Sequence, residues 1–396
     1  METALDGIKV LELCNGIAGS YCTKILADYG ADVVKVETPS SGDVLRSIGP
    51  FLDDKPDLET SGLFLYLNTN KKSITLNLAS PTGASIFKNL VKQADVIVES
   101  FSPQVMPNFG LEYKTLRELN PRLVMTSITP FGQTGPYRDY KATDLNVWAL
   151  SGILYETGDP EREPLKIGSN ETAYMAGFHS VLATLAALYY RDETGVGQHL
   201  DVSAWEAFQT AEPYMPLLYS QMGGLVRQRA GLHWPWGILP CKDGYVGFFF
   251  ATQPNWESLC VLMGMPELLD KPGYSTPLER GEHAEEITSI ITSWLKDKHM
   301  EEVFHAAQEL RLPLTPVPDI SQIIDIPQHK ARGYFIDINH PVAGKLTYPG
   351  AIFKLSETPW RAGRAPLLGE HNQDIYCGHL GYSMEHLSGL REQGII

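Results

Sequence analysis

Apolar runs and amphipathic stretches alternate along the first part of the chain. The runs at 8–13 and 33–36 consist mostly of β-prone residues, and the stretch between them at 21–29 reads as a helix. Gly30 follows that stretch directly, and glycine commonly ends a helix there. Two parallel strands need a crossover connection, usually a helix, so the beginning of the chain predicts a βαβ unit.

The same alternation continues to about residue 210. It predicts further strands at 73–78, 96–98, 123–128 and 198–202, and further helices at 82–93, 116–120, 173–191 and from Ala204. Strands that alternate with helices favour a mostly parallel sheet covered by helices on both faces. The sequence therefore predicts the α/β class for this part of the chain.

The pattern changes near Gly223, where an aromatic and proline-rich stretch begins. We expect a large domain at 1–224 and a smaller domain at 225–325. The smaller domain has a predicted strand at 245–250 and predicted helices at 255–263 and 300–309. The remaining segment, 326–396, shows mainly strand and turn signals and is interpreted as a linker and a return of the chain to the large domain.

Composition narrows the classes of partner. The chain has 396 residues and a net charge of −15, which disfavours nucleic acid and anionic membrane surfaces. No segment has about 20 consecutive apolar residues. The N-terminal residues do not resemble a signal peptide, and the five cysteines form no CxxC pair. We expect a soluble, cytoplasmic protein without a disulfide framework.

Common catalytic and cofactor motifs are absent. Residues 15–19 occupy the place of a dinucleotide loop but lack the GxGxxG spacing, so a tight turn is predicted. Neither a Walker A motif nor a GxSxG elbow occurs. His199 and Asp201 share one face of a predicted strand, but no third ligand converges on them, so no metal site is expected.

A series of short motifs extends from one end of the chain to the other: GIKVLEL at 7–13, ADYGADVVKVE at 27–37, NKKSITL at 70–76, ADVIVE at 94–99, NPRLV at 120–124, FGQTGPY at 131–137, LAAL at 185–188, TGVGQ at 194–198, PQHKARG at 327–333 and LGEH at 368–371. In this order they resemble the family III CoA-transferases, the CaiB/BaiF-like group that contains formyl-CoA transferase and the carnitine and bile-acid CoA-transferases.

The resemblance implies a fold and an activity. Family members have a large Rossmann-like domain with a parallel sheet built from both chain ends, a smaller α+β domain between them, and two chains interlocked like rings. An aspartate attacks an acyl-CoA thioester, and CoA then passes to a second carboxylic acid, which is covalent catalysis. CoA and acyl-CoA are substrates, and no permanently bound cofactor is implied.

The resemblance also indicates a missing nucleophile. The family aspartate lies four residues before a glycine, which is Gly177 here, so its position is taken by Ala173. A methyl group cannot attack a thioester. Glu171 is the nearest carboxylate and is only a weak candidate substitute. Asp144 matches an acidic residue near the acyl group, or alternatively caps the helix that follows it.

Candidate CoA-binding residues remain. The resemblance gives Leu76 and Phe101 as apolar walls and Lys141 as a cation, with Ile17, Lys72 and its neighbour Lys71 as further candidates. Leu76 and Phe101 have a plain structural alternative as core residues, and Lys141 has one as a solvated loop lysine.

Three basic positions of the family are lost. They are Thr38, Ser102 and Asn108 in this chain. Arginine and lysine are the natural partners of the CoA phosphates, so their loss should weaken CoA binding.

The first hypothesis is therefore a non-catalytic subunit of a heteromeric CoA-transferase. A homologous chain with the intact aspartate would carry the chemistry and move CoA from an acyl-CoA such as succinyl-CoA to a carboxylic acid. The two-subunit succinyl-CoA:(R)-benzylsuccinate CoA-transferase of anaerobic aromatic degradation is an arrangement of this kind.

Three alternatives remain. One is a homodimer of this chain in which Ala173 is an engineered replacement of the native aspartate. Another is an acyl-CoA racemase, which needs a His–Asp pair to move an α-proton and finds no clear match here. The last is a structural or ligand-sensing protein.

Overall fold

The computed structural model describes residues 3–158, 161–211, 214–222, 236–250 and 252–396. The chain divides into two compact units. The first comprises Met1–Thr157, Pro164–Gly224 and Tyr334–Ile396, and the second comprises Gly158–Glu163 and Leu225–Gly333. The first unit thus contains both ends of the chain. The second extends beyond residue 325, the limit that the sequence suggested.

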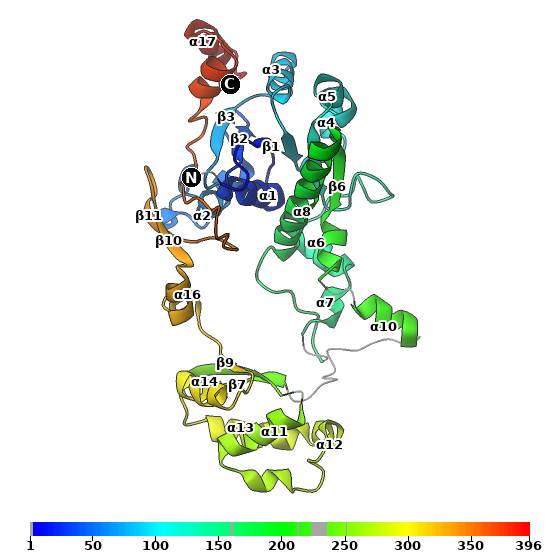
Figure 1. The fold of residues 1–396 in the computed structure, drawn as a ribbon, viewed down its shortest axis with the longest axis vertical. Coiled ribbons are helices and arrows are strands. Elements are labelled where there is room, and N and C mark those ends of the chain that lie inside the picture. The colour runs from blue at the N-terminus through cyan, green and yellow to red at the C-terminus, as the bar shows by residue number, and fades with distance from the viewer. Residues whose placement is uncertain (1–2, 159–160, 212–213, 223–235, 251) are drawn as a thin grey trace. The chain divides into compact units, whose positions relative to one another are not determined.

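A six-stranded parallel sheet forms the centre of the first unit (Figure 1). Its strands are β1 (Lys9–Leu13), β2 (Asp32–Glu37), β3 (Lys72–Thr75), β4 (Val96–Glu99), β5 (Val124–Thr129) and β6 (His199–Ser203). Their order is β3-β2-β1-β4-β5-β6, so the chain changes direction across the sheet between β1 and β4. This confirms the predicted α/β class. In open sheets of this kind, ligands bind at the carboxyl ends of the strands next to that reversal.

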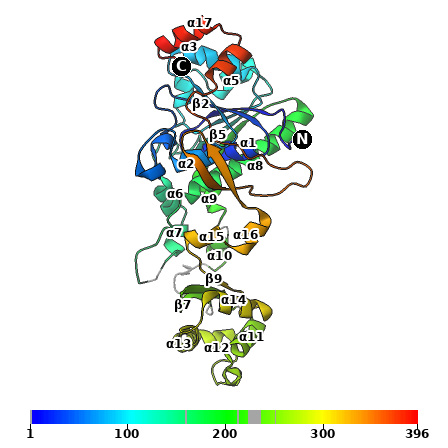
Figure 2. The same ribbon diagram turned by 90° about the vertical axis from the view of Figure 1, so that its left-hand side faces the viewer.

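Helices cover both faces of the sheet, as the alternation predicted. Figure 2 shows α1 (Ile17–Asp28) and α8 (Glu171–Thr194) on one side. Their core includes Val10, Val33 and Val98, while the neighbouring strand residues Leu11, Val34 and Ile97 belong to the opposite core. Successive strand residues point to opposite faces, so these apolar runs are buried on both sides.

The second face is covered by α3 (Pro81–Val91), α5 (Tyr113–Leu119) and the C-terminal helix α17 (Met384–Glu392). The sequence reading of the last segment, which stressed strands and turns, missed α17. Ser383 caps this helix by accepting a hydrogen bond from His386 N at 3.1 Å, and Leu387 and Leu390 are buried against the sheet. A nine-residue helix owes most of its stability to such packing, so its local pattern is a weak signal.

The other elements of the first unit are α2 (Gly62–Leu67), α4 (Val105–Asn108), α6 (Asp144–Leu150), α7 (Ile153–Glu156), α9 (Ala204–Gln209), α10 (Tyr214–Met222), the antiparallel pair β10 (Phe335–His340) and β11 (Gly344–Pro349), two 3₁₀ turns at Val44–Ser47 and Leu52–Asp54, and a π-helical turn at Asp374–His379. None of the described helices is both long and apolar enough to cross a membrane.

The second unit has its own core. Its antiparallel sheet contains β7 (Trp236–Cys241), β8 (Gly244–Phe249) and β9 (Leu314–Pro316) in the order β7-β8-β9. Its helices are α11 (Gln253–Met263), α12 (Pro277–Glu282), α13 (Ala284–Leu295), α14 (Met300–Glu309), α15 (Ile320–Ile323), α16 (Pro327–Arg332) and a 3₁₀ turn at Pro266–Leu269. The strand predicted at 245–250 and the helices predicted at 255–263 and 300–309 correspond to β8, α11 and α14. Residues 232–235 of the aromatic stretch lie outside the described residues.

Candidate functional site

A cavity of about 220 Å³ lies at the carboxyl edge of the large sheet. Its lining follows the ends of β1, β2, β3 and β4: Leu13, Cys14, Asn15, Val36, Glu37, Thr38, Leu76, Asn77, Leu78, Ala79, Phe101, Val105 and Phe109. The position is the one that the reversal of strand order favours for a ligand. The structure therefore brings together Leu76 and Phe101, the two predicted apolar walls, with Thr38 on the same cavity.

The cavity offers no free charge to a ligand among its described lining residues. Its one charged lining residue, Glu37, is saturated: its carboxylate accepts from Arg46 Nε at 2.7 Å, Arg46 Nη2 at 2.9 Å, Ser73 Oγ at 2.6 Å and Asp43 N at 2.9 Å. Burial alone would raise the pKa of Glu37, but the hydrogen bond and charge of Arg46, the charge of Lys35 and the hydrogen bond from Ser73 together outweigh it and lower the pKa. An apolar lining with a few polar groups suits an uncharged planar ring better than a phosphate.

A second, more open hollow of about 450 Å³ adjoins this cavity and shares Leu78, Ala79 and Phe109 with it. We call it the outer groove. Its remaining lining residues are Ser80, Pro81, Ala84, Ser85, Lys88, Asn108 and Gly110. Asn108 was one of the three lost basic positions in the sequence comparison, and it faces the groove. Lys88 on α3 was not singled out from the sequence.

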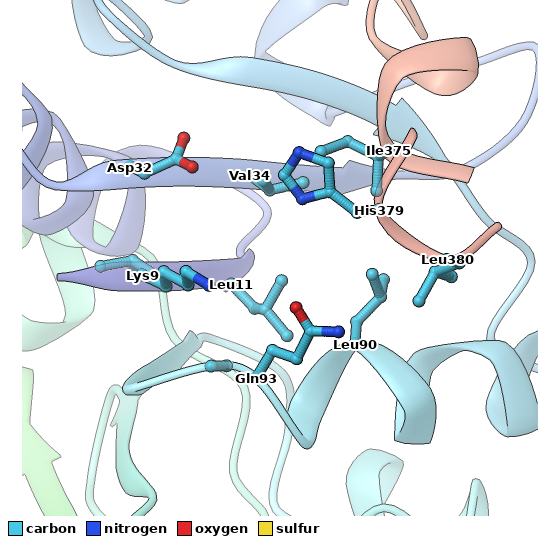
Figure 3. A pocket seen from close by; sticks show the side chains of 11 residues that line it. Lys9, Leu11, Asp32, Val34, Leu90, Gln93, Ile375, His379 and Leu380 are labelled. Carbon is cyan, nitrogen blue, oxygen red and sulfur yellow. The ribbon is translucent and has the colours of Figure 1, made fainter. Parts of the chain in front are cut away.

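The predicted cation Lys72 lies elsewhere. It is the first residue of β3, at the opposite end of the strand from Leu76, and its ammonium pairs with Asp32 Oδ1 at 2.7 Å. Asp32 lines a third hollow with the polar residues Lys9, Gln93 and His379 and with apolar side chains that include Leu11, Val34, Leu90, Ile375 and Leu380 (Figure 3). This hollow has about 50 Å³ of room, enough for a few water molecules only.

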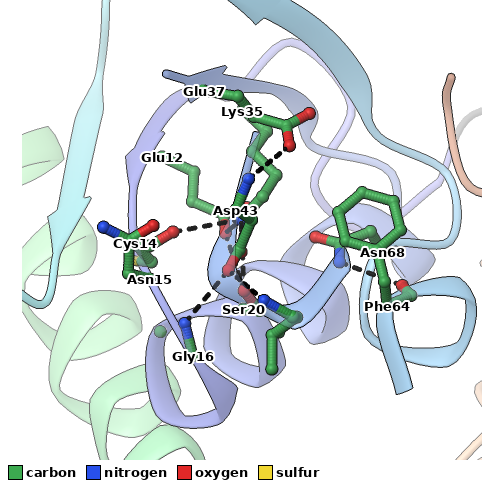
Figure 4. A network of polar contacts seen from close by, with 12 residues as sticks. Glu12, Cys14, Asn15, Gly16, Ser20, Lys35, Glu37, Asp43, Phe64 and Asn68 are labelled. Atoms are coloured by element: carbon green, nitrogen blue, oxygen red, sulfur yellow. Dashed lines mark hydrogen bonds and ion pairs between the residues drawn. The ribbon is translucent and has the colours of Figure 1, made fainter. Parts of the chain in front are cut away.

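Lys71 is held in a buried ionic cluster. Its ammonium pairs with Glu12 Oε2 at 2.9 Å, and Lys35 bridges Glu12 Oε1 and Asp43 Oδ2, each at 2.6 Å. Burial would raise the pKa of Glu12, but the two ammonium groups lower it to about 2. Figure 4 shows this cluster beside the turn between β1 and α1, where Asp43 Oδ1 accepts from Gly16 N at 3.3 Å. The cluster thus supports the turn that contributes Asn15 to the cavity.

Ala173 is the third residue after Asn170, which precedes α8, and its amide donates to Asn170 O at 3.1 Å. The first turn of α8 is capped from a distance by Asp144, whose Oδ1 accepts from Thr172 N at 3.0 Å and Thr172 Oγ1 at 2.6 Å. Asp144 Oδ2 pairs with Lys166 Nζ at 2.8 Å. Asp144 therefore caps α8, and not the helix α6 that it begins, whose capping residue is Thr143.

The start of α8 lies against the start of α1. Tyr174 and Tyr21 meet edge to face with ring centroids 4.9 Å apart, and Ile17 packs in the same apolar cluster. A Cβ on Gly177 would lie 2.5 Å from Ala18 O, so only glycine allows this approach. The turn at residues 15–17 therefore borders both the cavity, through Asn15, and the first turn of α8, through Ile17.

The remaining candidates are placed apart from these hollows. Lys141 is an exposed loop residue before α6 and lines none of the hollows described above. His179 on α8 has two structural partners, with its Nδ1 2.9 Å from Met175 O and its Nε2 3.1 Å from Thr210 Oγ1. Within the described ranges, no group of three or more His, Cys, Asp or Glu residues could hold a metal ion.

His199 and Asp201 have structural partners. His199 Nε2 lies 2.8 Å from Ser127 Oγ, and Asp201 accepts from Gln133 N at 2.9 Å. Ser127 in turn contacts a residue that sequence reasoning missed, Glu99 at the end of β4. Glu99 is buried and accepts from Phe101 N at 2.8 Å, so it fixes the backbone of a cavity wall. Glu99 is the last residue of a strand whose other residues are apolar, and this feature of the sequence could have indicated a buried carboxylate.

Burial raises the pKa of Glu99 to about 7 against the opposing bonds to Ser127 and Phe101 N, and the charge of Asp201 adds to the rise. Because this pKa lies above the ordinary value of 4.5, the wild type should lose stability relative to Glu99→Gln as the pH rises from about 4.5 through 7. We expect a relative change of up to roughly 3 kcal/mol between pH 5 and pH 8.5. Urea unfolding of both proteins at these pH values measures it, and parallel pH profiles would contradict the assignment.

Comparisons of this chain with known sequences all identify CoA-transferases. A family model described as CoA-transferase family III matches residues 5–372. The chain is 34% identical to succinyl-CoA–L-malate CoA-transferase beta subunit of Chloroflexus aurantiacus, over 99% of this chain and 98% of the relative. It is also 34% identical to formyl-CoA:oxalate CoA-transferase of Rhodopseudomonas palustris, over 100% of this chain and 97% of that protein.

Two solved structures have the same fold as this chain. A CAIB/BAIF family protein from Brucella suis superposes with a TM-score of 0.87 at 30% identity, covering 96% of this chain and 100% of that chain. A hypothetical protein from Mycobacterium tuberculosis has a TM-score of 0.81 at 26% identity, covering 93% of this chain and 98% of that one.

Proposed function

The chain belongs to CoA-transferase family III, and from this premise we propose that it is the non-catalytic subunit of a heteromeric enzyme that moves CoA from an acyl-CoA such as succinyl-CoA to a carboxylic acid. The observation that carries the proposal is Ala173. The family resemblance assigns the nucleophile to this position, and its methyl group can neither attack a thioester nor form an anhydride.

Neighbouring carboxylates do not replace the nucleophile. Asp144 is occupied by the first turn of α8 and by Lys166. Glu171 precedes Ala173 by two positions on the same helix, which turns its side chain by about 200° around the helix axis. A nucleophile needs a free carboxylate aimed at the thioester carbon, and neither residue meets that requirement.

The surface of α8 supports an assembly of two chains. Phe178, Leu182, Leu185 and Tyr189 follow one another at helical spacing and are 36–74% exposed. Such a stripe on the outer side of a helix is typical of a face that packs against another protein. One relative carries the name of a beta subunit, which is consistent with a homologous partner chain.

The proposal assigns the cavity to the adenosine end of CoA. An uncharged planar ring fits a lining of Leu76, Leu78, Phe101 and Phe109. The phosphates would then extend toward the outer groove, which adjoins the cavity.

A CoA-transfer assay tests the proposal, with succinyl-CoA as donor and a panel of carboxylic acids as acceptors. We expect the isolated chain to be inactive. We expect activity when it is co-expressed with a homologous chain of the same organism that has aspartate at the position of Ala173, and we expect the two chains to elute together in size-exclusion chromatography. Turnover by the isolated chain, or failure of every such homologue to assemble with it, would contradict the proposal.

A further inference from the structure

The outer groove contains an unpaired positive charge. Lys88 lines it from the last turn of α3, and its ammonium group lies 3.9 Å from the place where a side chain on Gly110 would begin. Among the described residues, no hydrogen bond or ion pair engages this ammonium group. Lys88 is half-buried and lines the groove, and a lysine with its stem packed on apolar surface keeps its charged end toward solvent.

The rest of the groove suits an anion. Within the described part of the chain, its lining includes no acidic residue and no other cation, and it offers the amide of Asn108 and the hydroxyl of Ser85 as donors. Glu112, the residue directly before α5, feels the charge of Lys88, but its carboxylate accepts a hydrogen bond from Thr115 Oγ1 at 2.7 Å, which is the main reason for its lowered pKa. Lys88 therefore remains available.

We propose that Lys88 binds a phosphate monoester of the ligand whose uncharged ring occupies the cavity, and so takes over the charge that the family places at Asn108. The inference rests on the proposed function, under which the ligand is CoA and the monoester is its 3′-phosphate. The cavity disfavours this group because the only charge among its described lining residues, Glu37, is negative and saturated. The adjoining groove supplies the missing cation.

Lys92 provides a matched control. It lies one helical turn after Lys88 as the exposed C-cap residue of α3, where its ammonium donates to Asn89 Oδ1 at 2.9 Å, and it is not among the described lining residues of the groove. The two lysines contribute equally to the net charge of the protein. A difference between Lys88→Ala and Lys92→Ala therefore reports position and not overall charge.

Isothermal titration of CoA and of dephospho-CoA, which lacks the 3′-phosphate, tests the inference. We expect the wild type to bind CoA about tenfold more tightly than dephospho-CoA, as one hydrogen bond to a charged group allows. Lys88→Ala should remove this preference by weakening CoA alone. Lys88→Arg should keep it, and Lys92→Ala should change neither affinity.

The outcomes separate the inference from the proposed function. Equal affinities of the wild type for the two ligands would overturn the role of Lys88 and leave CoA binding in place. An equal loss in Lys88→Ala and Lys92→Ala would also overturn it, because the effect would be one of net charge. Binding of neither ligand would contradict both the inference and the assignment of the cavity to CoA.

Discussion

CoA transfer by the heteromeric complex is expected to fall by at least roughly 10⁴-fold when the partner's nucleophilic aspartate is replaced with alanine, because removal of a nucleophile abolishes the covalent route. The same assay should show less than a twofold change for Ala173→Ser in this chain, since the side chain at that position takes no part in the reaction. Initial rates with succinyl-CoA, measured on complexes purified in the same way, give both numbers.

The variant Ala173→Asp makes the comparison sharper. It restores a carboxylate to the first turn of α8, beside an Asp144 cap that is already paired with Lys166. We expect the isolated variant to remain inactive. Catalytic groups act as a unit, so the return of one of them does not restore the activity. Thr38 and Ser102 also still occupy positions at which the family resemblance implies basic residues. Turnover by the isolated variant would show a complete site in this chain and would favour the homodimeric alternative.

The parts of the fold that follow a regular period could be predicted from sequence. β4 begins with an apolar run and β5 is rich in β-branched residues, both strands are buried, and α8 is long enough for its pattern to be clear. α17 was missed because its stability comes from burying two leucines against a sheet formed by residues far earlier in the chain. Local pattern carries no record of such a contact.

The candidate site could be predicted from sequence where its residues directly follow a strand. Leu76 and Phe101 follow β3 and β4 directly, and parallel strands bring their carboxyl ends to one edge, so the two residues meet at the cavity. Lys72 is the first residue of β3, so it lies at the amino edge of the parallel sheet, away from the cavity. The direction of the predicted strand already implies this position. Lys71 and Lys72 are both basic, so residue type alone does not distinguish the buried Lys71 from Lys72 at the strand start.

Other assignments depend on contacts between distant residues. Asp144 caps a helix that begins 27 residues later, and nothing in the local sequence distinguishes this from a cap on its own helix. Lys88 and Lys92 are likewise equivalent in a helical pattern. Lys88 lines the outer groove because α3 packs beside residues 108–110, a contact between segments that the helical pattern does not show.

The largest expected loss of stability follows from Lys35→Met. The side chains of Lys35, Glu12 and Asp43 are all fully buried, at 0% exposure, and the substitution keeps the length of the side chain while it removes the charge. Asp43 would then be left without its cation, and Glu12 would keep only Lys71. Breaking a buried ion pair by removing one partner costs about 3–5 kcal/mol of the free energy of unfolding.

Lys72→Met is the matched control on the neighbouring strand. Its pair with Asp32 is 36% and 38% exposed, and exposed pairs contribute about 0–1 kcal/mol. Urea unfolding of both variants at one pH should therefore separate them by at least roughly 2 kcal/mol. Similar losses in the two variants would mean that the cluster is reorganised or hydrated without its central cation.

The Lys35→Met substitution should also affect ligand binding in the cavity. Asp43 Oδ1 accepts from Gly16 N in the turn and from Leu45 N in its own segment, so without Lys35 these two backbone amides are the remaining described donors to this carboxylate. The turn contributes Asn15 to the cavity and places Ile17 beside the start of α8. We therefore expect Lys35→Met to weaken CoA binding under conditions in which the variant is still folded, whereas Lys72→Met should leave the affinity unchanged. A variant that is destabilised but binds CoA as tightly as the wild type would show that the cluster serves the fold alone.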